Sequence, residues 1–578
     1  MPVQIERVDT DILILGSGGA GLFAALHAQQ SAPAGTRITL AVKGLIGKCG
    51  CTRMVQGGYN VALAPGDSVE RHFMDTIEGG GWLNDQDLAW LLVNEAQLRI
   101  RELENELGCF FDRNPDGTVH QKAFAGQTFD RTVHKGDLTG IEIINRLAEQ
   151  VWRRDVLRLE DHRAVELIPA ADGSGLAGVL MLDMRTGAPL LVRAKAVLLA
   201  TGGGPTMYKY HTPSGDKSCD GLAMALRAGL PLRDMEMVQF HPTGLLAGPA
   251  TRMTGTVLEE GLRGAGGHLV DGTGERFMFA YDERGERATR DVVSRSIEDR
   301  IRKGFGTPNC GVWLEMAHLG PDNVRRGFKG MVERCADCGF DLAGSRVEVV
   351  PTAHYIMGGV VFGADCATPM HRLFAAGEDT GGVHGANRLG GNGVANSTVF
   401  GGLAGDAMPP FVRAHGAHAD PDAAAIEAAL DRVEAPFRRP AGDLNAIRER
   451  LYELMWDDVG ILRTGETLTR GLAALHELDS ALDAAGVADG NRAYNLTWHD
   501  WLNLKNLVLV SRSIAAAALA REDSRGAHFR EDFPETSELA ASRYTVARLE
   551  GERIPVTTEP VHFTRVFPGE TLLREAAE

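Results

Sequence analysis

The chain has 578 residues, of which 44% are hydrophobic. Because this exceeds what one hydrophobic core usually supports, we expect roughly two to four domains. The 60 basic residues against 77 acidic ones give a net charge of −17, which disfavours nucleic acid and anionic lipid as general partners but leaves room for a local cationic pocket. No apolar run approaches about 18 residues, and residues 1–10 resemble neither a signal peptide nor a transit peptide. We therefore expect a cytoplasmic protein without direct membrane insertion.

The most informative local pattern is the glycine fingerprint near the N-terminus. An apolar run ends in Gly16-x-Gly18-x-x-Gly21, opens an Ala-rich helical segment and is followed by a second apolar run. The first glycine permits a tight turn, the second lets backbone approach a pyrophosphate, and the third lets the helix pack on the strand. The pattern predicts a dinucleotide site. An acid usually ends the second strand, but Val42 is followed by Lys43, so the fingerprint alone leaves the identity of the dinucleotide open.

The later elements follow from apolar periodicity. Residues 75–155 show helical spacing. Three short alternating runs then predict an antiparallel meander, at Val165–Ile168, Gly178–Asp183 and Leu190–Lys195. From about residue 425 the composition changes to Ala, Leu, Glu and Arg with helical period, which predicts a helical bundle, and residues 546–578 suggest a strand-rich tail.

The cysteines predict neither disulfides nor a metal centre. There are eight of them, too sparse for a disulfide scaffold in a chain of 578 residues, so we expect reduced thiols. Cys335 and Cys338 form one CxxC with no second pair at ligand spacing. We therefore predict no metal site.

The loop after the second predicted strand carries a family resemblance. Its sequence, KGLIGKCGCTRMVQGGYN, resembles the flavoprotein subunit of succinate dehydrogenase and fumarate reductase, and the related L-aspartate oxidase. The matching residues are Lys43, Thr52, Gln56, Gly57 and Gly58. The resemblance implies FAD. Respiratory members attach it covalently through a histidine, whose place is taken here by Cys51, so we expect non-covalent FAD unless Cys51 itself forms a thioether.

Five later motifs follow in the order of the same family. They are MEMVQFHPTG (235–244), VLEEGLRGAGG (257–267), GERFMFAYDERGERATRDVVSR (274–295), VPTAHYIMGGV (350–360) and GVHGANRLGGNG (382–393). The resemblance implies an α/β fold, in which a Rossmann-like FAD-binding domain carries an inserted α+β capping domain and is followed by a helical bundle. The implied boundaries are 1–238 with 346–420 for the FAD domain, 239–345 for the cap, 421–545 for the bundle and 546–578 for the tail.

The resemblance also assigns the cofactor-binding residues. They are Gly16, Gly18, Gly21, Lys43, Thr52, Gln56, Gly57, Gly58, Thr201, Gly202, Asp220, Glu378 and Asn392. Glu378 matches the position that binds the FAD ribose, so it is expected to supply the acid missing after the second strand. The helix predicted from Val394 is expected to point its N-terminus at the flavin.

A second set of residues predicts a carboxylate-binding pocket. His241, Arg290, His354 and Arg388 offer positive charge and directional donors, which suit a small carboxylate. By resemblance, hydride passes between flavin N5 and a carbon–carbon bond next to the carboxylate. Arg290 would be the proton donor, with Glu260 and Arg263 as its relay. The residues expected to bind or polarise the substrate are His241, Thr243, Glu259, His354 and Arg388.

Three residues depart from the pattern of the respiratory enzymes. Cys51 replaces the covalent histidine, and Ala265 stands where an acid is usual. Glu259 occupies the place of a small hydroxyl residue that binds a substrate carboxylate. A carboxylate there would repel a dicarboxylate, unless it binds an ammonium, pairs with a lysine or arginine, or points away.

Three functions remain open from the sequence. The first is a fumarate reductase-like or succinate dehydrogenase-like enzyme, with an iron–sulfur partner subunit that could hold it at the inner membrane face. The second is an oxidase of an amino acid such as L-aspartate. Residues 455–460 resemble the corresponding segment of L-aspartate oxidase. The third is a flavin-binding module without turnover. We rank the first highest, because residues 387–392 and 357–359 look closer to the dehydrogenase branch.

Overall fold

The computed structural model describes residues 5–248, 251 and 253–573. Its largest sheet has seven strands in the order β6-β2-β1-β9-β8-β7, with β16 also paired to β9. Their bounds are β1 (Glu6–Leu15), β2 (Ile38–Ala41), β6 (Leu157–Leu159), β7 (His162–Pro169), β8 (Leu176–Asp183), β9 (Pro189–Leu199) and β16 (Leu373–Ala375). Strand β1 runs parallel to β2 and β9, and β7, β8 and β9 form the predicted antiparallel meander.

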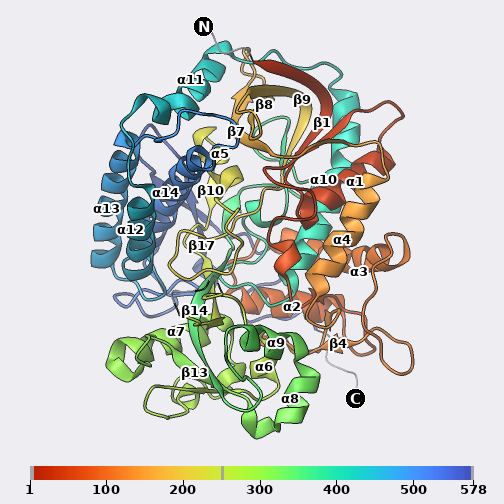
Figure 1. Cartoon of the computed structure of the whole chain (residues 1–578). Helices are drawn as coiled ribbons and strands as arrows, with labels where there is room; N and C mark the ends of the chain where they lie inside the picture. The colour runs from red at the N-terminus through yellow and green to blue at the C-terminus, as the bar shows by residue number, and fades with distance from the viewer. Residues whose placement is uncertain (1–4, 249–250, 252, 574–578) are drawn as a thin grey trace.

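Helices cover both faces of this sheet. Figure 1 shows one group beside β1: α1 (Gly19–Ser31), α3 (Gln86–Asn105), α4 (Thr139–Trp152) and α10 (Asn392–Ala414). Helix α1 contacts α4 and α10. The approach to α10 is so close that a side chain at Gly401 would lie 2.5 Å from the Ala20 carbonyl oxygen. Helix α2 (Val69–Gly79) packs on α3, and α5 (Asp220–Arg227) lies against β7.

A second sheet forms the separate lobe drawn in green in Figure 1. Its order is β11-β14-β13-β12, and all neighbours are antiparallel. The strands are β11 (Val238–Leu245), β12 (His268–Val270), β13 (Val312–Glu315) and β14 (Arg346–Ile356). The helices around it are α6 (Gly261–Gly264), α7 (Arg290–Arg300), α8 (Pro321–Gly327) and α9 (Lys329–Asp337). This lobe, here called the cap, has its own hydrophobic core.

The C-terminal third is mostly helical. It contains α11 (Ala423–Glu434), α12 (Leu444–Asp457), α13 (Gly465–Ala484) and α14 (Leu496–Ala520). Within the described residues, α14 is the one helix long and apolar enough to span a membrane, but 72% of its most apolar window is buried inside the protein. Burial of that extent is typical of a core helix.

Short strands connect the C-terminal segment to the middle of the chain. The C-terminal β17 (Arg543–Ala547) and β18 (Val556–Pro560) join β10 (Leu232–Arg233) and β15 (Gly359–Val360) in a four-stranded sheet. Strand β17 thus begins before residue 546, where the tail was expected to start, and it pairs with the body of the protein. A three-stranded sheet of β3 (Tyr59–Asn60), β4 (Gln121–Lys122) and β5 (Thr132–Val133) lies near the fingerprint loop.

Candidate active site

Two neighbouring cavities meet at the glycine fingerprint. The larger, of about 180 Å³, is lined by the loop 51–58, the cap segment 256–260 and the start of α10. The smaller, of about 60 Å³, lies at the carboxyl ends of β1 and β2. Gly18 and Thr201 line both. One extended ligand can therefore run from one cavity into the other, as a dinucleotide requires.

The glycines of the fingerprint have the expected steric roles. Gly16 has a positive φ of 106°, and a side chain there would lie 2.2 Å from the Ala200 carbonyl oxygen. A side chain at Gly21 would lie 1.9 Å from the Gly16 carbonyl oxygen, so this glycine allows the helix to pack against the turn. Gly18 is open towards the cavities. The nearby Ser17 hydroxyl is buried without a partner among the described residues, as a phosphate donor would be.

The smaller cavity contains a buried ionic cluster. Lys43 Nζ lies 2.6 Å from one Asp220 oxygen, and Arg163 Nη2 lies 2.7 Å from the other. Burial disfavours ionisation of Asp220, but Arg163 and Lys43 outweigh it and hold its pKa well below the usual range. The acid next to Lys43 at the end of β2 is therefore Asp220, which is already paired.

Glu378, expected to bind the FAD ribose, lies in the larger cavity and not beside Lys43 at the end of β2. It lines the larger cavity and accepts hydrogen bonds from the backbone N–H groups of Ile356 and Gly204, at 3.1 and 3.3 Å. Burial raises its pKa to about 7. Glu378 and Asp220 both match family motifs, and the sequence does not show which of the two lies close to Lys43.

One end of the larger cavity, where the flavin is expected, is formed by the loop 51–58 and by the segment that follows β9. Thr52, Gln56, Gly57, Gly58, Thr201 and Gly202 all line it, as predicted. Thr52 Oγ1 accepts a hydrogen bond from the Gly19 N–H at 3.0 Å, so the loop is tied to the start of α1. Cys51 also lines the cavity, and burial raises the pKa of its thiol to about 12.

Asn392 is used differently from the prediction. Its side chain lines neither cavity and instead binds Asn60, His72 and Thr76 at 2.8, 3.0 and 3.1 Å. These bonds fix the first turn of α10, whose preceding residue, Gly391, has a positive φ of 90°. The groups of this helix start that do line the cavity are Gly393, Val394 and Ser397.

The three residues predicted to form a proton relay lie next to one another, joined by hydrogen bonds between Arg290 and Glu260 and by a longer ion pair between Glu260 and Arg263. Arg290, at the start of α7, donates through Nε and Nη2 to Glu260 Oε2, at 2.9 and 2.6 Å. The other Glu260 oxygen lies 3.7 Å from Arg263 Nη2. Burial disfavours the Glu260 carboxylate, but the two arginines hold its pKa below the usual range. Arg290 and Glu260 line the cavity, whereas Arg263 lies behind Glu260.

The carboxylate-binding residues meet in the same cavity. Arg388, His241 and His354 all line it, and the two imidazole rings are 5.5 Å apart. Burial, together with Arg290, lowers the pKa of Arg388 to about 10. Burial and the arginines hold the pKa of both histidines well below the usual range, so at neutral pH they contribute hydrogen bonds and not the positive charge expected from the sequence.

Thr243 does not reach the cavity, which corrects its assignment to substrate binding. Its hydroxyl donates to the Leu258 carbonyl at 2.8 Å, and the side chain is fully buried. It therefore ties the segment that carries Glu259 and Glu260 to β11.

Sequence reasoning missed Gln239, which connects the two active-site arginines. Its Oε1 accepts from Arg290 Nη1 and from Arg388 Nη2, both at 3.1 Å. Its Nε2 donates to the Asn387 side chain and to the Arg388 carbonyl, at 2.8 and 2.7 Å. One signal was available in the sequence. Gln239 stands two residues before His241, and side chains two residues apart in a strand point to the same face.

Glu259, whose orientation the sequence left open, lines the cavity. Its Oε2 lies 3.4 Å from Lys122 Nζ, at the end of β4. Burial raises the pKa of Glu259, and Lys122 opposes that shift. The carboxylate therefore faces the site and has a cationic partner.

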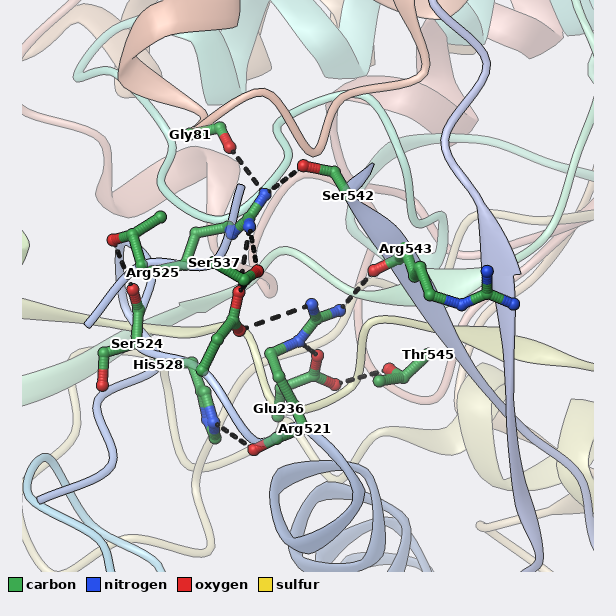
Figure 2. Close-up of polar contacts among 12 residues, drawn as sticks. Gly81, Glu236, Arg521, Ser524, Arg525, His528, Ser537, Ser542, Arg543 and Thr545 are labelled. Carbon is green, nitrogen blue, oxygen red and sulfur yellow. Dashed lines mark hydrogen bonds and ion pairs between the residues drawn. The ribbon is translucent and has the colours of Figure 1, made fainter. Parts of the chain in front are cut away.

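A buried polar cluster behind the cavity fixes the turn after α14 (Figure 2). Arg521 and the Thr545 hydroxyl both donate to Glu236, at 2.5 and 2.7 Å. Arg521 also donates to Asp234 at 3.1 Å. Arg525 donates to the Gly81 carbonyl at 3.2 Å.

The residues that follow this cluster touch the arginine-bearing segments. The Ala527 N–H donates to the Ala386 carbonyl at 2.8 Å, two residues before Arg388. Arg295, on α7 with Arg290, donates to the Gly526 carbonyl at 2.6 Å. The C-terminal turn thus holds both segments in place.

Comparisons with known proteins identify the family of this chain. A family model described as FAD binding domain matches residues 11–394, and one described as fumarate reductase flavoprotein C-term matches 448–573. A protein of Methanothermobacter marburgensis that forms part of its CoM/CoB fumarate reductase is 41% identical over 544 residues, covering 92% of this chain and 96% of that protein. The L-aspartate oxidase of a Nostoc species is 34% identical over 545 residues, covering 91% of each.

A solved structure supports the same assignment. E. coli quinol fumarate reductase superposes with a TM-score of 0.92 at 32% identity, covering 98% of this chain and 99% of that one. The predicted fold class, with its FAD-binding domain, cap and helical region, is confirmed by this match. The chain belongs to the succinate dehydrogenase and fumarate reductase family of flavoproteins and is an FAD-dependent oxidoreductase.

Proposed function

We propose that this enzyme reduces the carbon–carbon double bond next to a carboxylate, or catalyses the reverse oxidation. Bound FAD supplies or accepts the hydride. The observation that carries the proposal is the chain from Arg290 through Glu260 to Arg263, which begins at the cavity wall. A flavin-binding module without turnover has no use for such a chain.

Arg290 is the group that exchanges a proton with the substrate carbon in this proposal. Arginine is ordinarily a weak acid for this purpose. Here its Nη2 donates to Glu260 at 2.6 Å, and Arg388 and Arg263 add positive charge nearby. Proton loss from Arg290 relieves repulsion among these cations, and Glu260 can then return a proton that arrives through Arg263.

Arg388 holds the substrate carboxylate. Its Nε is buried without a hydrogen-bond partner among the described residues, so a donor is left for an incoming anion. An unmet buried donor is costly, and a carboxylate would satisfy it through a charge-assisted bond. His241 and His354, which are neutral, add directional hydrogen bonds from the same cavity.

FAD is held without a covalent bond in this account. The groups that fit it are the glycine turn, Ser17, Lys43 with Asp220, and the backbone of the loop 51–58. Cys51 lines the cavity, but only the thiolate is a strong nucleophile, and a pKa of about 12 keeps this thiol protonated.

We further propose that an iron–sulfur subunit docks beside the loop that lines the flavin end. Leu45, Met54 and Leu138 are large apolar side chains that are 50%, 46% and 52% exposed. Their segments touch, because the Gly140 N–H donates to the Val55 carbonyl at 2.9 Å. Such a partner would give electrons a short route to the flavin. It would also place the chain at the cytoplasmic membrane face, in line with the cytoplasmic location predicted from the sequence.

Oxidation of an amino acid such as L-aspartate is the second candidate. The observation that favours it is the cavity-facing carboxylate of Glu259, which could bind an ammonium group. Anaerobic flavin reduction followed by stopped-flow mixing separates the two. Reoxidation by an enoate such as fumarate or another member of a panel supports the first function, whereas reduction of the oxidised enzyme by L-aspartate selects the second.

A further inference from the structure

Two adjacent glutamates of the cap, Glu259 and Glu260, differ in whether both of their carboxylate oxygens have a partner. Both oxygens of Glu260 face arginines, Oε2 towards Arg290 and Oε1 towards Arg263. Glu259 has one partner, Lys122, on Oε2 at 3.4 Å. Among the described residues, no donor reaches Glu259 Oε1. Oε1 lies next to Gly261 and remains an acceptor on a residue that lines the substrate cavity.

Lys122 does not cancel the negative character of the cavity wall. Glu259 is among the residues that line the cavity and Lys122 is not. The Lys122 ammonium lies 3.4 Å from Glu259 Oε2 and 5.7 Å from the centre of the Phe124 ring. Lys122 thus stabilises the buried carboxylate through one oxygen and leaves the other oxygen as an acceptor.

The same cavity also contains a cationic anchor. Arg388 has an unpartnered buried Nε, and it is the group that suits a carboxylate. If one carboxylate of a dicarboxylate binds Arg388, the other is repelled by the carboxylate of Glu259, unless both bind the arginines. A ligand with one carboxylate and one hydrogen-bond donor matches both groups.

We propose that Glu259 selects the substrate, and that the preferred substrate is an enoate, or its saturated counterpart, with a single carboxylate and an ammonium or amide group at its far end. This inference rests on the proposed function, because it describes the same cavity. The carboxylate binds Arg388, and the far N–H donor binds Glu259 Oε1. A symmetrical dicarboxylate is disfavoured at the Glu259 end.

Equilibrium binding to the oxidised holoenzyme tests this without requiring turnover. The probes are succinate, its monoamide succinamate and 4-aminobutanoate, which share a chain of similar length and differ in one end group. Flavin absorbance reports each dissociation constant. We expect the wild-type protein to bind 4-aminobutanoate about a hundredfold more tightly than succinate, the scale of opposed carboxylates at about 4 Å under partial screening, with succinamate between them.

Two variants locate the effect. Glu259→Gln removes the charge with little change in shape, so it should strengthen succinate binding and weaken 4-aminobutanoate binding. Glu333→Gln is the matched control, because it removes the same charge from an exposed position on α9 of the cap. It should leave all three constants unchanged.

The outcomes separate the inference from the proposed function. Succinate binding as tightly as 4-aminobutanoate to the wild-type protein overturns the role of Glu259, even if a variant fails to fold. A ratio unchanged by Glu259→Gln overturns it as well. If the expected ratio is found but no enoate, including 4-aminobut-2-enoate, reoxidises the reduced enzyme, then the proposed reaction fails and the binding role of Glu259 stands.

Discussion

The two neighbouring cavities differ in how completely their charged side chains are paired. In the smaller cavity, both Asp220 oxygens are engaged by Lys43 and Arg163 before any ligand arrives. In the larger cavity, Arg388 Nε is buried without a partner among the described residues. A paired site needs no rearrangement to receive a cofactor, whereas unmet donors gain a partner when an anion binds.

This difference indicates where the chain stores its binding energy. In the smaller cavity, the charges of Lys43, Arg163 and Asp220 are paired next to the glycine turn. This cluster therefore keeps the cofactor site in a fixed geometry. The substrate end keeps Arg290, Arg263 and Arg388 close together, and the carboxylate of Glu260 lies between the first two. Such an arrangement is costly when empty and is relieved by a carboxylate ligand.

Breaking the satisfied end should have the largest effect. Asp220→Asn removes one charge from a buried cluster and leaves Lys43 and Arg163 without their anion, which should lower the free energy of unfolding by about 3–5 kcal/mol. Urea unfolding and the bound FAD per chain measure this. Asp172→Asn, at an exposed aspartate of the same domain, is the control. Equal stability of the two variants would show that the cluster does not hold this end together.

Loosening the substrate end should cost less. Gln239→Met keeps the volume but removes the acceptor shared by Arg290 and Arg388, so both arginines lose a fixed orientation. We expect kcat to fall about tenfold, the scale of one or two buried hydrogen bonds, while FAD content stays normal. Gln97→Met, which breaks a single bond to the Ala62 carbonyl away from the cavity, should not change kcat. A Gln239→Met enzyme with wild-type kcat would remove Gln239 from this role.

The smallest effect is expected at Cys51. Because its thiol stays protonated, Cys51→Ser should leave FAD content and turnover unchanged, and acid precipitation should release FAD from both proteins. Yellow colour that remains with the wild-type precipitate, and is lost in the variant, would show a thioether at this residue.

The sequence predicted the features that have a local signal or a family motif. The strand, turn and helix around Gly16–Gly21 and the meander β7 to β9 were expected from local patterns, and the grouping of Arg290, Glu260 and Arg263 from the family resemblance. Each of these has a local signal, in the form of an apolar period, a glycine spacing or a family motif. The strand, turn, helix and meander could be predicted without knowledge of distant contacts, and the structure confirms them.

The features that were missed depend on long-range contacts. Lys43 meets Asp220 across 177 positions, Lys122 meets Glu259 across 137, and Gln239 meets Arg388 across 149. No spacing rule connects residues that far apart. The neutral state of the histidines was missed for a related reason, because burial that sets a pKa is a property of the folded chain.

The most direct test of the account compares two oxidants of the reduced holoenzyme in the wild-type protein and in Arg290→Lys. Reaction with an enoate needs a proton delivered by Arg290, whereas reaction with oxygen does not. We predict that stopped-flow reoxidation by the enoate slows by roughly a hundredfold or more in the variant, the scale of general acid catalysis, while reoxidation by oxygen is unchanged. Equal slowing of both reactions, or of neither, would contradict the assignment of Arg290 as the proton donor.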